Sequence, residues 1–194
     1  MTYHEVALKA SSDWFAYQNV LELETALQAV DLFHPNVILE IGTAHAGSLA
    51  AWCEVVQPEL AIGLDPLTIP RTPKMQTSFD NLVNTYNIKL IPHMDDDPRS
   101  ETELIEILGD KKVDFMFIDA AHDYPNVKYD FENYKKYLSP HALVGFHDIF
   151  VNDTLTNAGS RVGIYWNEIK EKYNYDEFYS HSSMGIGLLY INQK

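Results

Sequence analysis

An apolar run at residues 37–41 stops abruptly at a glycine turn, and this transition most constrains how the chain can fold. Such a run fits a strand covered on both faces, as in a parallel sheet, because a half-exposed strand would alternate polar and apolar residues. Gly42 can adopt backbone angles that other residues avoid, and Gly47 lets the next helix pack closely on the strand. The stretch predicts a strand, a tight turn and a helix. Alone, it fits a ligand site and a purely structural turn equally well.

Two acids accompany this turn. Glu40 lies inside the predicted buried strand, where a carboxylate needs hydrogen-bond partners, so it either holds the turn or faces a polar ligand. Asp65 ends a second apolar run, about 20 residues beyond the glycine turn. An acid there can accept hydrogen bonds from both hydroxyls of a ribose. A loop acid that caps the turn at Pro66 would give the same pattern.

Composition narrows the class of protein. The chain has 194 residues, of which 46% are hydrophobic, so we expect one core and a single domain over residues 1–194. A formal charge of -14 argues against nucleic acid as a partner, since such binding uses clustered Lys and Arg. The one cysteine, Cys53, excludes an internal disulfide and suits a reducing compartment. The sequence has no leader-like start and no apolar run of about 18 residues. We therefore expect no membrane span and a cytoplasmic location.

The rest of the chain alternates helical and strand patterns. Residues 11–32 have apolar side chains at helical spacing, with Ser11 or Ser12 as a cap, and predict a helical cover ahead of the sheet. A polar loop is expected at residues 151–160. Besides the first run, strands are predicted at residues 61–65, 88–91, 113–119 and 142–148, and a final hairpin near 177–191 with its last strand antiparallel.

Polar side chains gather where these strands end. The residues concerned are Glu40, Asp65, Asp119 with His122, and His147 with Asp148. Right-handed crossovers place the carboxyl ends of consecutive parallel strands along one edge of a sheet. Two histidines and two aspartates from neighbouring strand ends can therefore meet. Such a cluster suits either proton transfer or metal binding.

Two motifs carry a family resemblance: FIDAAHDY at residues 117–124 and FHDI at residues 146–149. With the glycine turn and Asp65, they resemble the class I S-adenosylmethionine-dependent methyltransferases. More narrowly, they are similar to small-molecule O-methyltransferases of the macrocin and cephalosporin-tailoring type, and more distantly to catechol-type enzymes. The resemblance covers residues 37–166. It implies a doubly wound, mostly parallel, seven-stranded Rossmann-like sheet over residues 36–194, with a last antiparallel strand and an N-terminal helical cover over residues 1–35.

The resemblance also implies site residues. Those expected to bind S-adenosylmethionine are Glu40, Gly42, Thr43, Gly47, Ser48, Asp65, Asp95 and Asp119. Those expected to hold a divalent metal such as magnesium or manganese are Asp119, His147 and Asp148. In metal-dependent relatives the position of His147 usually carries an acid or an amide. A histidine there either favours a softer transition ion or marks a site that has lost its metal and uses histidine as a base.

The expected reaction is methyl transfer to the hydroxyl of a small molecule, such as a sugar or a phenol. A sulfonium methyl is already activated, so the enzyme must align the acceptor, exclude water and remove the acceptor's proton. His122 is the first candidate for the base and His147 the second. Two other functions stay open: a protein that binds the cofactor or a nucleotide without catalysis, and a metal-dependent oxygenase with two histidines and one carboxylate. A homo-oligomer also stays open.

Overall fold

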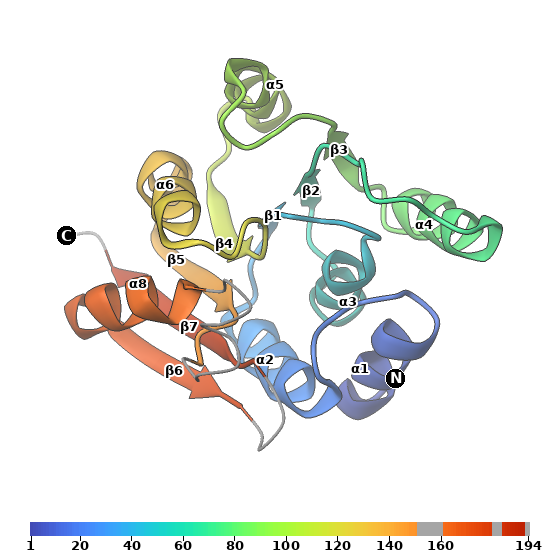
Figure 1. The fold of residues 1–194 in the computed structure, drawn as a ribbon, viewed down its shortest axis with the longest axis horizontal. Helices are drawn as coiled ribbons and strands as arrows, with labels where there is room; N and C mark the ends of the chain where they lie inside the picture. The colour runs from blue at the N-terminus through green and yellow to red at the C-terminus, as the bar shows by residue number, and fades with distance from the viewer. Residues whose placement is uncertain (151–160, 180–183, 193–194) are drawn as a thin grey trace.

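A computed structural model describes residues 1–150, 161–179 and 184–192 (Figure 1). Within these residues the strands form one seven-stranded sheet in the order β3-β2-β1-β4-β5-β7-β6. The strands are β1 Val37–Ile41, β2 Leu60–Leu64, β3 Lys89–Ile91, β4 Val113–Ile118, β5 Leu138–His147, β6 Asn174–Phe178 and β7 Ile186–Asn192. The first five are parallel, whereas β7 pairs antiparallel with β5 and with β6. This confirms the predicted Rossmann-like sheet and its antiparallel end. The loop expected at residues 151–160 lies outside the described residues.

Helices cover both faces of the sheet (Figure 1). On one face the core contains side chains of α1 Tyr3–Ser12, α2 Val20–Phe33, α3 Gly47–Val56 and α4 Pro73–Thr85. On the other face it contains side chains of α5 Pro98–Leu108, α6 Tyr124–Tyr134 and α8 Val162–Ile169. Short 3-10 turns follow α6 at Lys135–Tyr137 and α8 at Lys170–Lys172. None of the helices in the described part of the chain is long and apolar enough to cross a membrane.

Strand β1 supplies side chains to both cores, which explains its continuous apolar sequence. Ile38 packs with the α1–α4 side, while Leu39 and Ile41 pack with the α5–α8 side. Successive side chains of a strand point to opposite faces, so a strand with helices on both sides has no polar face. The apolar run is thus the consequence of a central position in a covered parallel sheet.

The helical cover differs from the prediction of one helix over residues 11–32. Helix α1 ends at Ser12, and α2 begins only at Val20, with Asn19 as its N-cap in a capping box with Glu22. Neither Ser11 nor Ser12 caps the second helix. Residues 13–19 form a loop that packs on the start of α3. A Cβ atom at Gly47 would lie 2.5 Å from the Trp14 carbonyl oxygen, so only a glycine permits this approach.

A buried acid on α6 gives a prediction for stability. Asp130 is fully buried, and neither of its carboxylate oxygens has a hydrogen-bond partner. Burial, together with the charge of Asp95, raises the pKa of Asp130 to about 9 from an ordinary 3.8. Between those two pH values the folded chain holds a proton that the unfolded chain has released. The stabilisation by this proton is therefore full at low pH and falls as the pH rises toward 9.

Asp130→Asn should remove this dependence, because an amide needs no proton to be neutral. We expect the variant to be more stable at pH 8 by about 1 kcal/mol, a rise in melting temperature of about 2–4 °C. Thermal unfolding at pH 5 and pH 8 measures the effect, with Asp110→Asn as the matched change at an exposed position. Equal melting temperatures for the Asp130 variant and the wild type at pH 8 would contradict the prediction.

Candidate functional site

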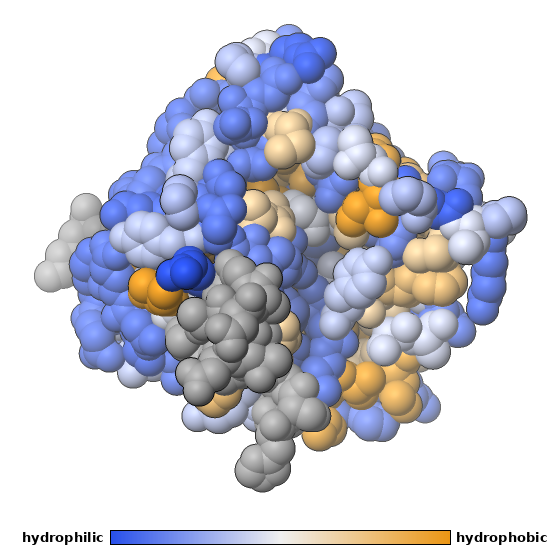
Figure 2. All heavy atoms as spheres, in the orientation of Figure 1, coloured by the Kyte–Doolittle hydropathy of each residue, from blue (hydrophilic) through white to orange (hydrophobic). Residues whose placement is uncertain are grey.

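A cavity of about 550 Å³ lies at the carboxyl edge of the parallel strands. Its wall includes the turn after β1, the end of β2, the loop after β3 and the segments that follow β4 and β5. The strand order reverses at β1, where the chain continues to β2 on one side and has β4 on the other. Doubly wound sheets bind their ligands at such a switch point. Figure 2 shows this face as hydrophilic over α5, α6 and α8, with hydrophobic residues gathered on the side of α1 and α4.

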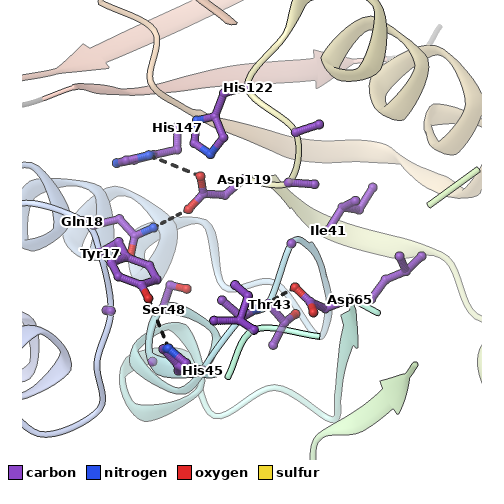
Figure 3. Close-up of a pocket in the computed structure, with 18 of the residues that line it drawn as sticks. Tyr17, Gln18, Ile41, Thr43, His45, Ser48, Asp65, Asp119, His122 and His147 are labelled. Atoms are coloured by element: carbon purple, nitrogen blue, oxygen red, sulfur yellow. Dashed lines mark hydrogen bonds and ion pairs between the residues drawn. The ribbon is translucent and has the colours of Figure 1, made fainter. Parts of the chain in front are cut away.

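Most of the predicted site residues line this cavity. They are Gly42, Thr43, Gly47, Ser48, Asp65, Asp95, Asp119, His122, His147 and Asp148. Figure 3 shows His122, His147 and Asp119 together at one side, with Thr43 and Asp65 at another. Residues separated by more than a hundred positions in the chain are thus brought to one cavity, as the pattern of strand ends predicted.

Glu40 is the one predicted site residue that does not line the cavity. It is fully buried. Its carboxylate accepts hydrogen bonds from the Ser48 hydroxyl at 3.1 Å and from the Trp52 indole at 3.2 Å. Burial raises the pKa of Glu40 well above its ordinary value. Of the two roles considered for this acid, these contacts correspond to the structural one, because Glu40 ties the start of α3 to β1.

Gly42 is required by the geometry of the turn. Its φ is +90°, and a Cβ atom there would lie 2.2 Å from the Asp119 carbonyl oxygen. The backbone nitrogen of Asp119 donates to the Ile41 carbonyl at 2.8 Å, and that of Gly42 donates to the Leu64 carbonyl at 2.8 Å. These bonds extend the sheet past the ends of its strands. The turn therefore lies directly against the Asp119 segment, with no room for a side chain.

Asp65 organises the same turn from β2. One carboxylate oxygen accepts from the Ala44 backbone nitrogen at 2.9 Å, and the other accepts from that of Leu67 at 2.6 Å. A carboxylate offers about four acceptor sites, so Asp65 keeps capacity for further donors. Both alternatives that the sequence left open for Asp65 are therefore compatible: it holds a loop, and it lines the cavity.

The side chains of two histidines and two aspartates contact one another at the ends of β4 and β5. The Nδ1 atom of His122 contacts Asp148 Oδ2, and this hydrogen bond raises the pKa of His122 despite partial burial. The Nδ1 atom of His147 lies 2.9 Å from Asp148 Oδ1 and 3.3 Å from Asp119 Oδ1. Although burial acts in the opposite direction, the contacts with His122 and His147 hold the pKa of Asp148 below its ordinary value. His122 is held from one side and remains half exposed to the cavity.

The sequence interpretation missed the loop at residues 13–19, which forms one wall of the cavity. Gln18 is 3% exposed and donates from Nε2 to Asp119 Oδ2 at 2.5 Å, while its Oε1 is buried without a partner. The hydroxyl of Tyr17 lies 3.1 Å from His45 Nε2 (Figure 3). A signal was present: Asn19 followed three residues later by Glu22 is a capping-box pattern that marks a helix start. It would have separated the loop from α2.

The predicted metal ligands meet, but they do not form a metal site. In the part of the chain that the structure describes, no group of three or more His, Cys, Asp or Glu side chains could hold a metal ion. His147 lies with Nδ1 toward Asp119 and Asp148 and with Nε2 3.1 Å from Glu22 Oε1. A metal ligand needs a ring nitrogen with a free lone pair. The Nε2 atom of His147 is hydrogen-bonded to Glu22, and its buried Nδ1 makes no hydrogen bond but lies within ion-pair distance of Asp119 and Asp148. A ring held in this way does not fit the metal.

The architecture is that of the α/β proteins with a doubly wound sheet, a class in which the switch point is the usual place of ligand binding. A family model described as methyltransferase domain matches residues 39–149, which is more than half of the chain. The chain therefore belongs to this family of methyltransferase domains. The matched segment runs from β1 to the residue after Asp148, and so contains all of the predicted cofactor and metal residues.

Solved structures share the fold at low sequence identity. The O-methyltransferase TomG from Streptomyces achromogenes, solved with S-adenosylmethionine, is 13% identical with a TM-score of 0.65, covering 99% of this chain and 90% of that one. The MycE methyltransferase of the mycinamycin pathway, solved with Mg, S-adenosylhomocysteine and mycinamycin VI, is 16% identical with a TM-score of 0.65. That match covers 100% of this chain and 55% of MycE. These likenesses confirm the predicted class I methyltransferase fold.

A curated relative is similar over part of the chain. The uncharacterized protein y4gI of Sinorhizobium fredii is 37% identical over 92 residues, which is 46% of this chain. The match spans 9% of the length of that relative. The similarity therefore concerns a segment of a much longer protein.

Proposed function

We propose that this protein is an S-adenosylmethionine-dependent methyltransferase that acts on a hydroxyl group of a small molecule. The observation that carries the proposal is the single cavity that joins the glycine turn, Asp65 and the Asp119–His122 segment. Membership of the methyltransferase-domain family supports it. The reducing cytoplasm is the location we propose, in keeping with a lone, buried and unpaired Cys53.

Different residues of the cavity would contact different parts of S-adenosylmethionine. Asp65 would accept hydrogen bonds from the ribose hydroxyls, and Asp95 would approach the adenine. The turn that contains Gly42 lines the cavity beside Asp119, where the methionine portion would lie. When bound, S-adenosylmethionine supplies a methyl group that its sulfonium already activates. The chain has to orient the acceptor in line with that methyl group and keep water out.

His122 is the proposed base. Its Nδ1 is engaged by Asp148, so the proton of the acceptor hydroxyl would be taken up at Nε2. A carboxylate that fixes the tautomer and orientation of a catalytic imidazole is the arrangement of the Ser-His-Asp triad. Asp148 would act through His122 as a positioning residue. His147, the second candidate, is buried and its Nε2 is hydrogen-bonded to Glu22, which makes it the weaker one.

The two other functions make different demands on the site. A metal-dependent oxygenase would need His122, His147 and a carboxylate arranged as ligands, and no group of three such side chains among the described residues could hold a metal ion. A binding protein without catalysis would use the same cavity, and activity alone separates it from an enzyme. No step of the proposed mechanism passes through a metal.

Ligand binding and transfer test the proposal together. We expect S-adenosylmethionine and S-adenosylhomocysteine to raise the melting temperature, while NAD does not. Transfer of a labelled methyl group from S-adenosylmethionine to a panel of sugars and phenols should identify an acceptor class. If NAD alone raised the melting temperature, S-adenosylmethionine would not be the cofactor. Binding without transfer to any acceptor of the panel would favour the binding protein.

Asp65→Asn should weaken the binding of the cofactor. The amide cannot accept from both hydroxyls and both backbone donors, and loss of a charged hydrogen bond costs about 1.5–3 kcal/mol. We therefore expect the dissociation constant for S-adenosylhomocysteine to rise about 10–100-fold by isothermal titration calorimetry. Asp80→Asn, at an exposed position on α4, is the matched control and should bind as the wild type does. Unchanged affinity in the Asp65 variant would remove this residue from the cofactor site.

A further inference from the structure

We propose that His147 takes the place of a divalent metal ion: its ring, carrying a proton on each nitrogen, is the cation among the strand-end carboxylates, and the site works without metal. The inference concerns the site of the proposed function. It rests on that function only for the statement that the site works without metal in catalysis. Metal binding itself can be measured without any acceptor.

The position of the ring supports this assignment. The side chain of His147 is 6% exposed and lies among three carboxylates from three different elements. Its Nε2 is 3.1 Å from Glu22 Oε1, and its Nδ1 is 2.9 Å from Asp148 Oδ1. Asp119 Oδ1 lies 3.3 Å from the same Nδ1. Only Nε2 makes a hydrogen bond, while Nδ1 is held by proximity to two carboxylates as an ion pair. A ring nitrogen beside a carboxylate is favourable only when it carries a proton, and here both nitrogens lie beside one.

Charge balance leads to the same conclusion. Buried carboxylates are stable only when they are paired with positive charge or coordinate a metal. A metal between Asp119 and Asp148 would meet the ring of His147, whose two N–H groups repel a cation. The ring can supply the positive charge that a divalent ion would otherwise provide. It also orients Asp148, which in turn holds His122.

Glu22, in the first turn of α2, holds the ring at Nε2. Its Oε1 accepts from the Asn19 backbone nitrogen at 2.9 Å, in the capping box of α2. Its Oε2 accepts from the Gly185 backbone nitrogen at 2.9 Å, just before β7. The carboxylate is thus held by two backbone donors, 2% of the residue is exposed, and its position is set by the fold. Through its bond to Nε2, Glu22 therefore fixes the orientation of the His147 ring among the strand-end carboxylates.

The test compares Mn²⁺ binding by the wild type and by His147→Asp, with and without saturating S-adenosylhomocysteine. Electron paramagnetic resonance of free Mn²⁺ gives the amount bound, and thermal unfolding with Mn²⁺ or Mg²⁺ gives the stabilisation. His141→Asp is the matched control, because it makes the same change on β5 at an exposed position away from the cavity.

We expect no stoichiometric Mn²⁺ binding by the wild type or the His141 control. His147→Asp should bind the ion at least about tenfold more tightly than the wild type and should recover melting temperature when it is added. Stoichiometric binding by the wild type would overturn the proposal, whether or not the variant folds. A folded His147→Asp that binds no better than the control would overturn it too. A wild type that binds no metal and no S-adenosylhomocysteine would instead count against the proposed function.

Discussion

Replacing His122 with alanine should slow methyl transfer at saturating substrate by about 10²–10⁴-fold, the usual contribution of a positioned general base. The half-exposed ring faces the cavity and contacts the buried Asp148, so its loss removes the proton acceptor. It leaves Asp65 and the glycine turn intact. We therefore expect the affinity for S-adenosylhomocysteine to remain close to that of the wild type. Steady-state kinetics and calorimetry measure the two quantities separately.

The matched control is His141→Ala, which removes an exposed imidazole from the opposite end of β5. It should leave both turnover and affinity unchanged. If His122→Ala loses cofactor affinity but keeps its turnover at saturation, then His122 binds the cofactor and is not the base. If both variants are fully active, His122 is not the base, and the base lies elsewhere in the cavity.

Gly42→Ala should disrupt both the fold and the site. The new Cβ atom would lie 2.2 Å from the Asp119 carbonyl oxygen and 2.5 Å from the Ala120 nitrogen, at a φ of +90°. Backbone strain at positive φ costs about 1–2 kcal/mol, and forced displacement of packed atoms costs about 1–3 kcal/mol more. A loss of about 2–5 kcal/mol should lower the melting temperature by roughly 4–20 °C. The affinity for S-adenosylhomocysteine should fall as well, because Asp119 is pushed from its place.

Gly109→Ala separates the cost of backbone strain from the cost of the steric contact. Gly109 also has a positive φ, +56°, but a Cβ atom there would meet no atom within 4 Å. It should cost only the backbone strain, about 1–3 kcal/mol, and should leave cofactor affinity unchanged. Thermal unfolding and calorimetry on the two variants measure the contribution of the contact. If Gly42→Ala is no less stable than Gly109→Ala, the close approach to Asp119 is not a constraint.

Local sequence patterns predicted most of the fold because the spacing of apolar residues reflects which side chains are buried. The run at β1 is apolar on both faces since helices cover both, and Gly42 is a glycine since Asp119 leaves no room. The boundary between α1 and α2 was not predicted. The apolar residues of the intervening loop, such as Trp14, are buried in the core on the α1–α4 side and so imitate a helical pattern. Periodicity reports burial and cannot separate a packed loop from a helix.

The amino-acid sequence by itself determined the order of strands and helices, the glycine turn and the placing of acids and histidines at one edge of a parallel sheet. These follow from local spacing and from the handedness of crossovers. Only the tertiary structure decided how those side chains pair. It turned Glu40 away from the cavity, brought Gln18 into it and placed Glu22 against His147. Such contacts depend on distances between remote segments, and no spacing along one chain records them.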